Sequence, residues 1–90
     1  MTLHTIAKTT VNTNLILPND VVLFWQDGVI LALKNSVILK QILSITPYCY
    51  ALSNDILARG LISLIDQQVV IIEMADVVQL TVQHSPQLAW

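Results

Sequence analysis

The sequence has few charged residues. Lys, Arg, Asp and Glu make up 11% of the 90 residues, whereas a typical soluble domain has about 25%. A folded chain of 10.0 kDa exposes on the order of 5,000 Å², which four Lys or Arg and six Asp or Glu cannot cover. Because large apolar patches on small proteins usually mark contacts with partner chains, we expect an oligomer.

Cations and cysteines are scarce as well. The net charge of −2 and the pI of about 5.3 argue against direct nucleic-acid binding, which requires a basic stripe to neutralise phosphates. The single cysteine, Cys49, excludes an internal disulfide and any site with several cysteine ligands.

Long apolar runs are also missing, although 54% of the residues are hydrophobic and the mean hydropathy is +0.67. A membrane-spanning helix needs about 20 mostly apolar residues, and here polar residues interrupt every few positions. Residues 1–8 lack the apolar region and cleavage site of a secretory signal, so we expect a cytoplasmic protein. Without repeats, linkers or low-complexity tracts, residues 1–90 are expected to form a single domain.

What the sequence does contain is an alternation of two apolar patterns. Short apolar runs at 3–7, 21–25, 48–52 and 69–72 are typical of strands, and the last three are of the kind found where a strand is buried on both faces. The segments that follow Ser36, Asn54 and Asp76 have helical spacing. This alternation predicts a small three-layer α/β/α domain whose mostly parallel sheet is covered on both faces.

Capping residues and prolines mark the expected ends of the helices. The side chain of Asn54 or Asp55 can accept a hydrogen bond from a free N–H group in the first turn of a short helix at 54–60. Arg59-Gly60 would end this helix. Pro47 ends the preceding helix, and Pro86 follows the last one and leaves residues 87–90 extended.

The Asp27-Gly28 pair lies between two strongly apolar segments, residues 21–25 and 29–33. Taken alone, Asp-Gly is a strong hairpin signal. The alternating pattern instead favours a strand ending at Gln26, a tight turn in which Gly28 adopts a special backbone conformation and Asp27 caps, and a helix starting at 29–33. Such a turn would lie at the carboxyl ends of the strands, where ligands and partners meet open α/β sheets.

Four blocks of the sequence carry a family resemblance: LHTI at 3–6, LFWQDGV at 23–29, YALSNDILARGL at 50–61 and DVVQLTVQHSPQLAW at 76–90. In this order and spacing they resemble the TusB/DsrH family, and the TusB branch more closely than the DsrH branch. The resemblance implies a DsrEFH-like fold. It also implies a structural subunit in a heterohexamer with TusC-like and TusD-like chains, which relays persulfide sulfur toward 2-thiolation of the tRNA wobble uridine.

The resemblance further implies that the persulfide is carried by the TusD-like chain. DsrH proteins have a cysteine after the first strand, but this chain has TTVNTNLIL there. Cys49 lies in an apolar run with no cation nearby, so we interpret it as a core residue and assign no catalytic residue. The alternatives are a DsrH-like persulfide carrier that uses Cys49, or a homo-oligomeric module that binds a small ligand near Asp27 and Asp55. No cofactor is expected.

The remaining candidates are polar residues and the C-terminal tryptophan. His4 and His84 have no metal-ligand spacing, so each is expected to be a satisfied polar position. Asp55 and Arg59 are spaced for an i,i+4 ion pair. Trp90 is expected to dock on its own sheet or on a partner rather than remain a free tail. Together, Asp27, Gly28, Asp55 and Trp90 form the predicted subunit interface.

Overall fold

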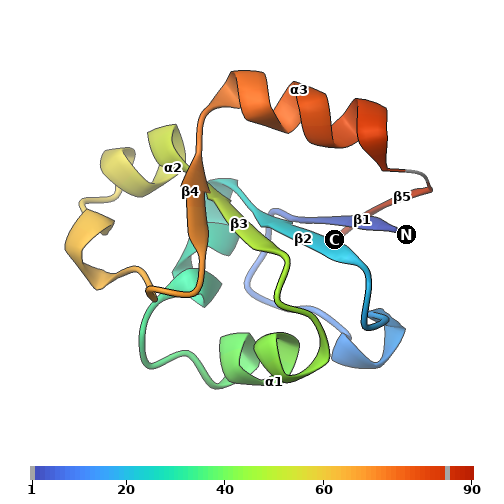
Figure 1. Cartoon of the computed structure of the whole chain (residues 1–90). Helices are drawn as coiled ribbons and strands as arrows, with labels where there is room; N and C mark the ends of the chain where they lie inside the picture. The colour runs from blue at the N-terminus through green and yellow to red at the C-terminus, as the bar shows by residue number, and fades with distance from the viewer. Residues whose placement is uncertain (1, 85) are drawn as a thin grey trace.

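The structure is a computed structural model that describes residues 2–84 and 86–90. Within these ranges five strands form one sheet in which every strand pairing is parallel, in the order β4-β3-β2-β1-β5 (Figure 1). The strands are β1 (Leu3–Ile6), β2 (Val21–Phe24), β3 (Cys49–Leu52), β4 (Val70–Ile72) and β5 (Gln87–Ala89). The predicted parallel sheet is therefore confirmed, and the predicted extended segment at 87–90 contributes its fifth strand.

Helices connect the strands. The α-helices are α1 (Val37–Ile45), α2 (Ser53–Ala58) and α3 (Met74–Gln83), and the 3-10 helices are η1 (Thr13–Leu15), η2 (Gln26–Ala32) and η3 (Ile62–Leu64). The Ser36 hydroxyl accepts from the Leu39 N–H at the start of α1. α3 begins earlier than the Asp76 signal indicated, because Glu73 and Asp76 form a capping box. None of the helices described is long and apolar enough to cross a membrane.

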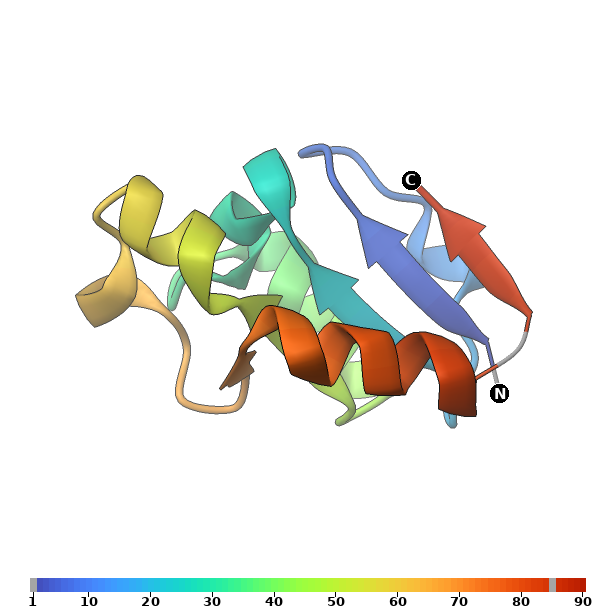
Figure 2. The ribbon, with the colours of Figure 1, turned by 90° about the horizontal axis from the view of Figure 1, so that it is seen from above.

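The order of the strands determines which face each connection covers. The chain proceeds from β1 through β2 and β3 to β4 in one direction, and the connections along this path contribute buried side chains to one face. It then returns across the whole sheet to place β5 beyond β1. Because parallel crossovers are right-handed, the reversal puts α3 on the opposite face, where Figure 2 shows it crossing over the strands. This gives the predicted three layers.

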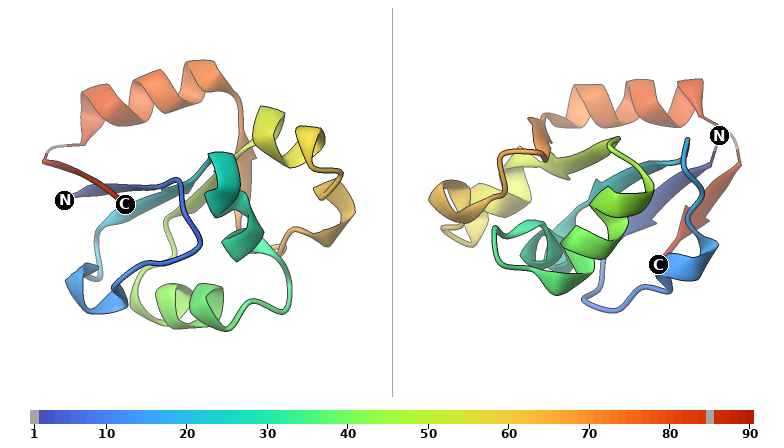
Figure 3. Two further views of the ribbon diagram at one scale, coloured as in Figure 1. Left: turned by 180° about the vertical axis from the view of Figure 1, so that it is seen from behind. Right: turned by 60° about the horizontal axis from the view of Figure 1, so that its bottom comes forward.

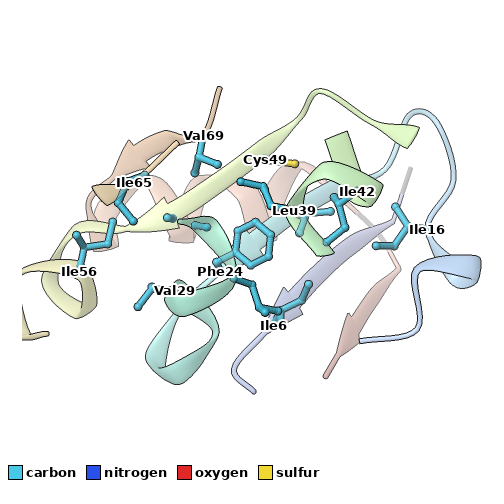
Figure 4. Packing of buried hydrophobic residues seen from close by; sticks show 14 residues of the cluster. Ile6, Ile16, Phe24, Val29, Leu39, Ile42, Cys49, Ile56, Ile65 and Val69 are labelled. Carbon is cyan, nitrogen blue, oxygen red and sulfur yellow. The ribbon is translucent and has the colours of Figure 1, made fainter. Parts of the chain in front are cut away.

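The larger group of buried apolar side chains lies between the sheet and α1, and we call it the α1-side core. Figure 3 shows α1 against this face, and Figure 4 shows Phe24 in the middle of the group. The buried members are Ile6, Ile16, Val22, Phe24, Val29, Leu31, Ala32, Leu39, Ile42, Cys49, Ala51, Ile56, Ile65 and Val69. They come from four strands or strand-flanking segments and from every connection on this face, so the group joins the whole α1 side of the domain.

The opposite group is smaller, and we call it the α3-side core. Its buried members are Leu3, Val21, Leu23, Leu52, Ile72 and Val77, and Val77 is the one residue of α3 that is fully buried. At the sheet edge, Val70 and Ile71 of β4 are exposed. The expectation that the run at 69–72 is buried on both faces is therefore wrong, because only Val69 and Ile72 of this run at the sheet edge are buried.

The segment that follows β2 differs from its prediction. η2 is a 3-10 helix that starts at Gln26 and includes the Asp-Gly pair, instead of a turn followed by a helix from Val29. Gly28 is buried and lacks the predicted special backbone conformation, because its φ is not positive, whereas Gln26 has a φ of 51°. A side chain at Gly28 would collide with the backbone carbonyl of Ile6, the carbon of which would lie 2.7 Å from the added Cβ. Glycine is needed here because η2 packs directly on β1.

Candidate subunit-contact surface at the strand ends

The carboxyl ends of the parallel strands meet at one edge of the sheet. Asp27 follows β2, Asp55 follows β3, and Trp90 follows β5. We call this edge, with Gln26, Asp27, Asp55, Arg59 and Trp90, the strand-end surface. The structure thus brings three of the four predicted interface residues to one edge, while the buried Gly28 could offer a partner only its backbone.

Arg59 joins two of these carboxylates. Its guanidinium donates to Asp27 Oδ1 at 2.8 Å and lies 3.6 Å from Asp55 Oδ1. The predicted i,i+4 pair between Asp55 and Arg59 is confirmed. The predicted caps are wrong: α2 has no side-chain cap, and Asp27 binds Arg59 instead of capping η2. Because Asp27 is 71% exposed, water screens its ion pair and the carboxylate remains accessible to a partner.

Gln26 connects the two strand ends through its backbone. Its N–H donates to Asp55 Oδ2 at 2.6 Å, a contact that spans 29 residues of sequence. Gln26 is the one non-glycine with positive φ among the described residues, and this left-handed conformation costs about 1–2 kcal/mol. The hydrogen bond to Asp55 offsets part of this cost. Asp55 therefore connects the turn after β2 to the helix after β3.

Trp90 docks on its own sheet, as one of the two predicted alternatives stated. Its backbone N–H donates to the Thr5 carbonyl at 2.8 Å, and its backbone carbonyl accepts from the Ala7 N–H at 3.3 Å. The indole stacks on the ring of His4 with the centroids 6.2 Å apart. Its other side borders an open cleft of about 460 Å³ that is also lined by Thr10, Val11 and Asn12.

The two histidines differ in their surroundings. His4 is buried and its Nε2 lies 2.8 Å from Asp20 Oδ2, so it is a satisfied polar position as predicted. His84 borders a hollow of about 290 Å³, and its Nδ1 is buried without a hydrogen-bond partner within the described residues. The prediction that His84 is a satisfied polar position is therefore wrong for its Nδ1. The Asp20 partner of His4 was missed because only the sheet brings these residues together.

Cys49 is part of the α1-side core, as predicted. It is 1% exposed, and Figure 4 shows its sulfur among the apolar side chains of that core. Burial raises the pKa of the thiol from 9.0 to about 12. The thiol also donates to the Thr46 carbonyl at 3.7 Å. A thiol in this position remains protonated near neutral pH, whereas nucleophilic sulfur chemistry requires the thiolate.

Comparisons with known proteins agree on one family. Residues 6–87 match the family model described as DsrH like protein. The chain is 38% identical over 94 aligned residues to Protein TusB of Buchnera aphidicola subsp. Baizongia pistaciae, with 98% of this chain and 99% of that protein covered. It is 42% identical over 71 residues to Protein TusB of Yersinia pestis (strain Pestoides F), with 79% of this chain and 75% of that protein covered.

Proposed function

The chain belongs to the DsrH-like family, and from this membership we propose that it is a non-catalytic structural subunit of a TusBCD-like sulfur-relay complex. Its partners would be TusC-like and TusD-like chains in a cytoplasmic heterohexamer. That complex would pass persulfide sulfur toward 2-thiolation of the tRNA wobble uridine, with the sulfur carried by a partner's cysteine.

The single observation that supports a non-catalytic role is the environment of Cys49. It is the only cysteine of the chain, so a persulfide carrier in this protein would have to use it. A carrier must expose a thiolate to a donor and an acceptor, yet Cys49 is buried and its pKa is raised to about 12. We therefore favour a structural role over the alternative of a DsrH-like carrier.

The strand-end surface is our candidate for one contact with a partner. Asp27 offers an exposed carboxylate that accepts from Arg59. Trp90 adds a partly exposed aromatic ring at the same edge of the sheet. An edge that combines an exposed charge with an aromatic ring suits recognition of another protein, although the same features would serve a small ligand in the homo-oligomeric alternative.

Co-expression with TusC-like and TusD-like chains, followed by native mass measurement, tests the role. We expect a heterohexamer that contains this chain. Sulfur transfer by the assembled complex should persist in Cys49→Ser, because no chemical step needs that thiol. A persulfide on Cys49 in the working complex, together with loss of transfer in the serine variant, would establish the carrier alternative.

A second experiment tests the strand-end surface. Asp27→Asn should leave the fold intact, because the lost ion pair is exposed, but it should weaken assembly with the partner chains. Asp66→Asn is a matched control, because Asp66 precedes β4 and lies away from the carboxyl ends of the strands. Equal assembly of both variants with the partners would exclude Asp27 as a contact residue.

A further inference from the structure

A buried polar network fastens the last strand to the rest of the sheet. Asp20 accepts at 3.0 Å from the Thr2 N–H, at 2.9 Å from the Leu17 N–H and at 2.8 Å from His4 Nε2. On the other side of the ring, His4 Nδ1 lies 3.2 Å from Trp90 Nε1. The imidazole therefore connects a carboxylate that precedes β2 with an indole that follows β5.

The partners of the ring define its protonation state. An indole N–H can only donate, so His4 Nδ1 must be the acceptor and carry no proton. The carboxylate of Asp20 can only accept, so the proton of the neutral imidazole lies on Nε2. Burial alone would raise the pKa of Asp20, but the hydrogen bonds from Thr2, His4 and Leu17 outweigh this effect and lower it. Asp20 therefore stays charged at a lower pH than an ordinary aspartate does.

Among the described residues, the direct neighbours of His4 include one charged group. The residues paired with it in the sheet are Val22 of β2 and Leu88 of β5, both apolar. Asp20 is the one ionisable side chain within hydrogen-bond distance of the ring among residues 2–84 and 86–90. Asp20 and Trp90 thus contact the two nitrogens of a ring that is 1% exposed.

We propose that His4 is a proton-sensitive latch for β5, which holds Trp90 while the ring is neutral and releases Trp90 and β5 when Nδ1 takes up a proton. Protonation leaves the contact with Asp20 intact but turns Nδ1 into a donor that faces the indole donor. No acceptor remains between the two N–H groups, and the short strand β5 has only β1 as a neighbour.

Release would change the strand-end surface. Trp90 borders the cleft with Thr10, Val11 and Asn12, so its departure would remove one wall of that cleft. It would also free the β1 edge, where the Thr5 carbonyl and the Ala7 N–H now bond to Trp90. The latch does not depend on the proposed sulfur-relay role, because it involves only contacts within this chain.

Nuclear magnetic resonance of the full chain between pH 8 and pH 5 tests the latch. The His84→Gln background removes the second histidine signal, so the ring nitrogens of His4 can be followed alone. We expect the Nε2–H form at pH 8. As Nδ1 is protonated, hydrogen-exchange protection of the Trp90 and Ala7 amides should fall about tenfold, after correction for intrinsic rates. The Val22 amide, which bonds to the Tyr48 carbonyl inside the sheet, should keep its protection.

Trp90→Phe is the matched variant, since it keeps an aromatic ring but has no N–H to donate. Its β5 protection should be low already at pH 8 and should no longer follow the titration of His4. Unchanged protection of Trp90 and Ala7 through that titration would overturn the proposal. So would a ring that stays neutral until Val22 also loses protection, or a Trp90→Phe variant with the same pH dependence as its parent.

Discussion

The two helices that cover the sheet differ on their solvent sides. The outward side of α1 carries Lys40, Gln41 and Ser44 beside a single exposed valine, Val37. The exposed residues of α3 are Met74, Ala75, Asp76, Val78, Gln79, Val82 and Gln83, and Val78 and Val82 are 55% and 77% exposed. α1 therefore exposes mainly polar side chains, as a helix that faces water does, whereas α3 exposes apolar side chains among its polar ones.

The cores beneath the two helices differ in the same way. The α1-side core joins side chains from every connection on its face, while α3 buries fully only Val77. Stability should therefore come mainly from the α1 side, and the α3 side should contribute more to association. The α3 layer thus combines the smaller core with several exposed apolar side chains.

The largest expected effect is at Phe24, which lies in the middle of the α1-side core. Phe24→Ala should cost about 3–5 kcal/mol, because the side chain is fully buried and leaves a cavity. Leu80→Ala on the partly buried side of α3 should cost about 2 kcal/mol, the low end for such truncations. Urea unfolding measures both. Equal losses would mean that the two cores stabilise the fold to the same extent.

The next largest effect is expected at Gly28, where η2 packs on β1. Gly28→Ala should cost about 3 kcal/mol, because the new Cβ would collide with the backbone carbonyl of Ile6. Gly60→Ala is the matched control: it has φ +65° and open space, so it should cost only about 1 kcal/mol of backbone strain. A harmless Gly28→Ala would show that η2 can move away from β1, and the α1 side would be less rigid than its packing indicates.

Alkaline pH should weaken the α1-side core through Cys49. The folded thiol keeps its proton up to about pH 12, whereas the unfolded thiol loses it near 9.0. The native state then binds more protons than the unfolded state, so stability falls as pH rises through this window, by about 1.4 kcal/mol per unit. Denaturant unfolding at pH 8.5 and 10 should show this loss in the wild type. Cys49→Ala should lose less over the same interval, and identical losses would mean that Cys49 is accessible to water.

The smallest effect on stability is expected on the outward side of α3. Val82→Gln should change the free energy of unfolding by less than about 0.5 kcal/mol, because the side chain is already exposed. It should nevertheless reduce self-association of the isolated chain, measured by analytical ultracentrifugation at micromolar concentration. Val37→Gln on α1, at a valine that is 68% exposed, should reduce it less. The reverse order would assign association to the α1 side.

Several features of the domain could be predicted from residue order alone, because they depend on neighbours in the sequence. The apolar runs at 3–7, 21–25, 48–52 and 69–72 predicted β1, β2, β3 and β4, and Pro47 and Pro86 predicted where helices end. The burial of Cys49 followed from its apolar neighbours. Each inference succeeded because the backbone and side-chain preferences involved act over only a few residues.

The strand-end contacts were beyond such reasoning, because their partners are far apart in the sequence. Aspartate is a common helix-capping residue, so local rules predicted that Asp27 and Asp55 cap the nearest helices. In the fold, Arg59 lies close enough to bind Asp27, and Asp55 meets the Gln26 N–H. A side chain bonds to the donors that the assembled sheet brings within reach, which capping rules cannot anticipate.

By itself the sequence determined the alternation of strands and helices, the family, the absence of disulfides, and a surface poor in charge. Only the tertiary structure decided which of its residues meet. It moved the positive φ from Gly28 to Gln26, joined His4 to Asp20 and Trp90, and left β4 exposed as an edge. The physical reason is that local pattern fixes the conformation of each segment, whereas strand order and the reversal of the chain after β4 fix which segments become neighbours.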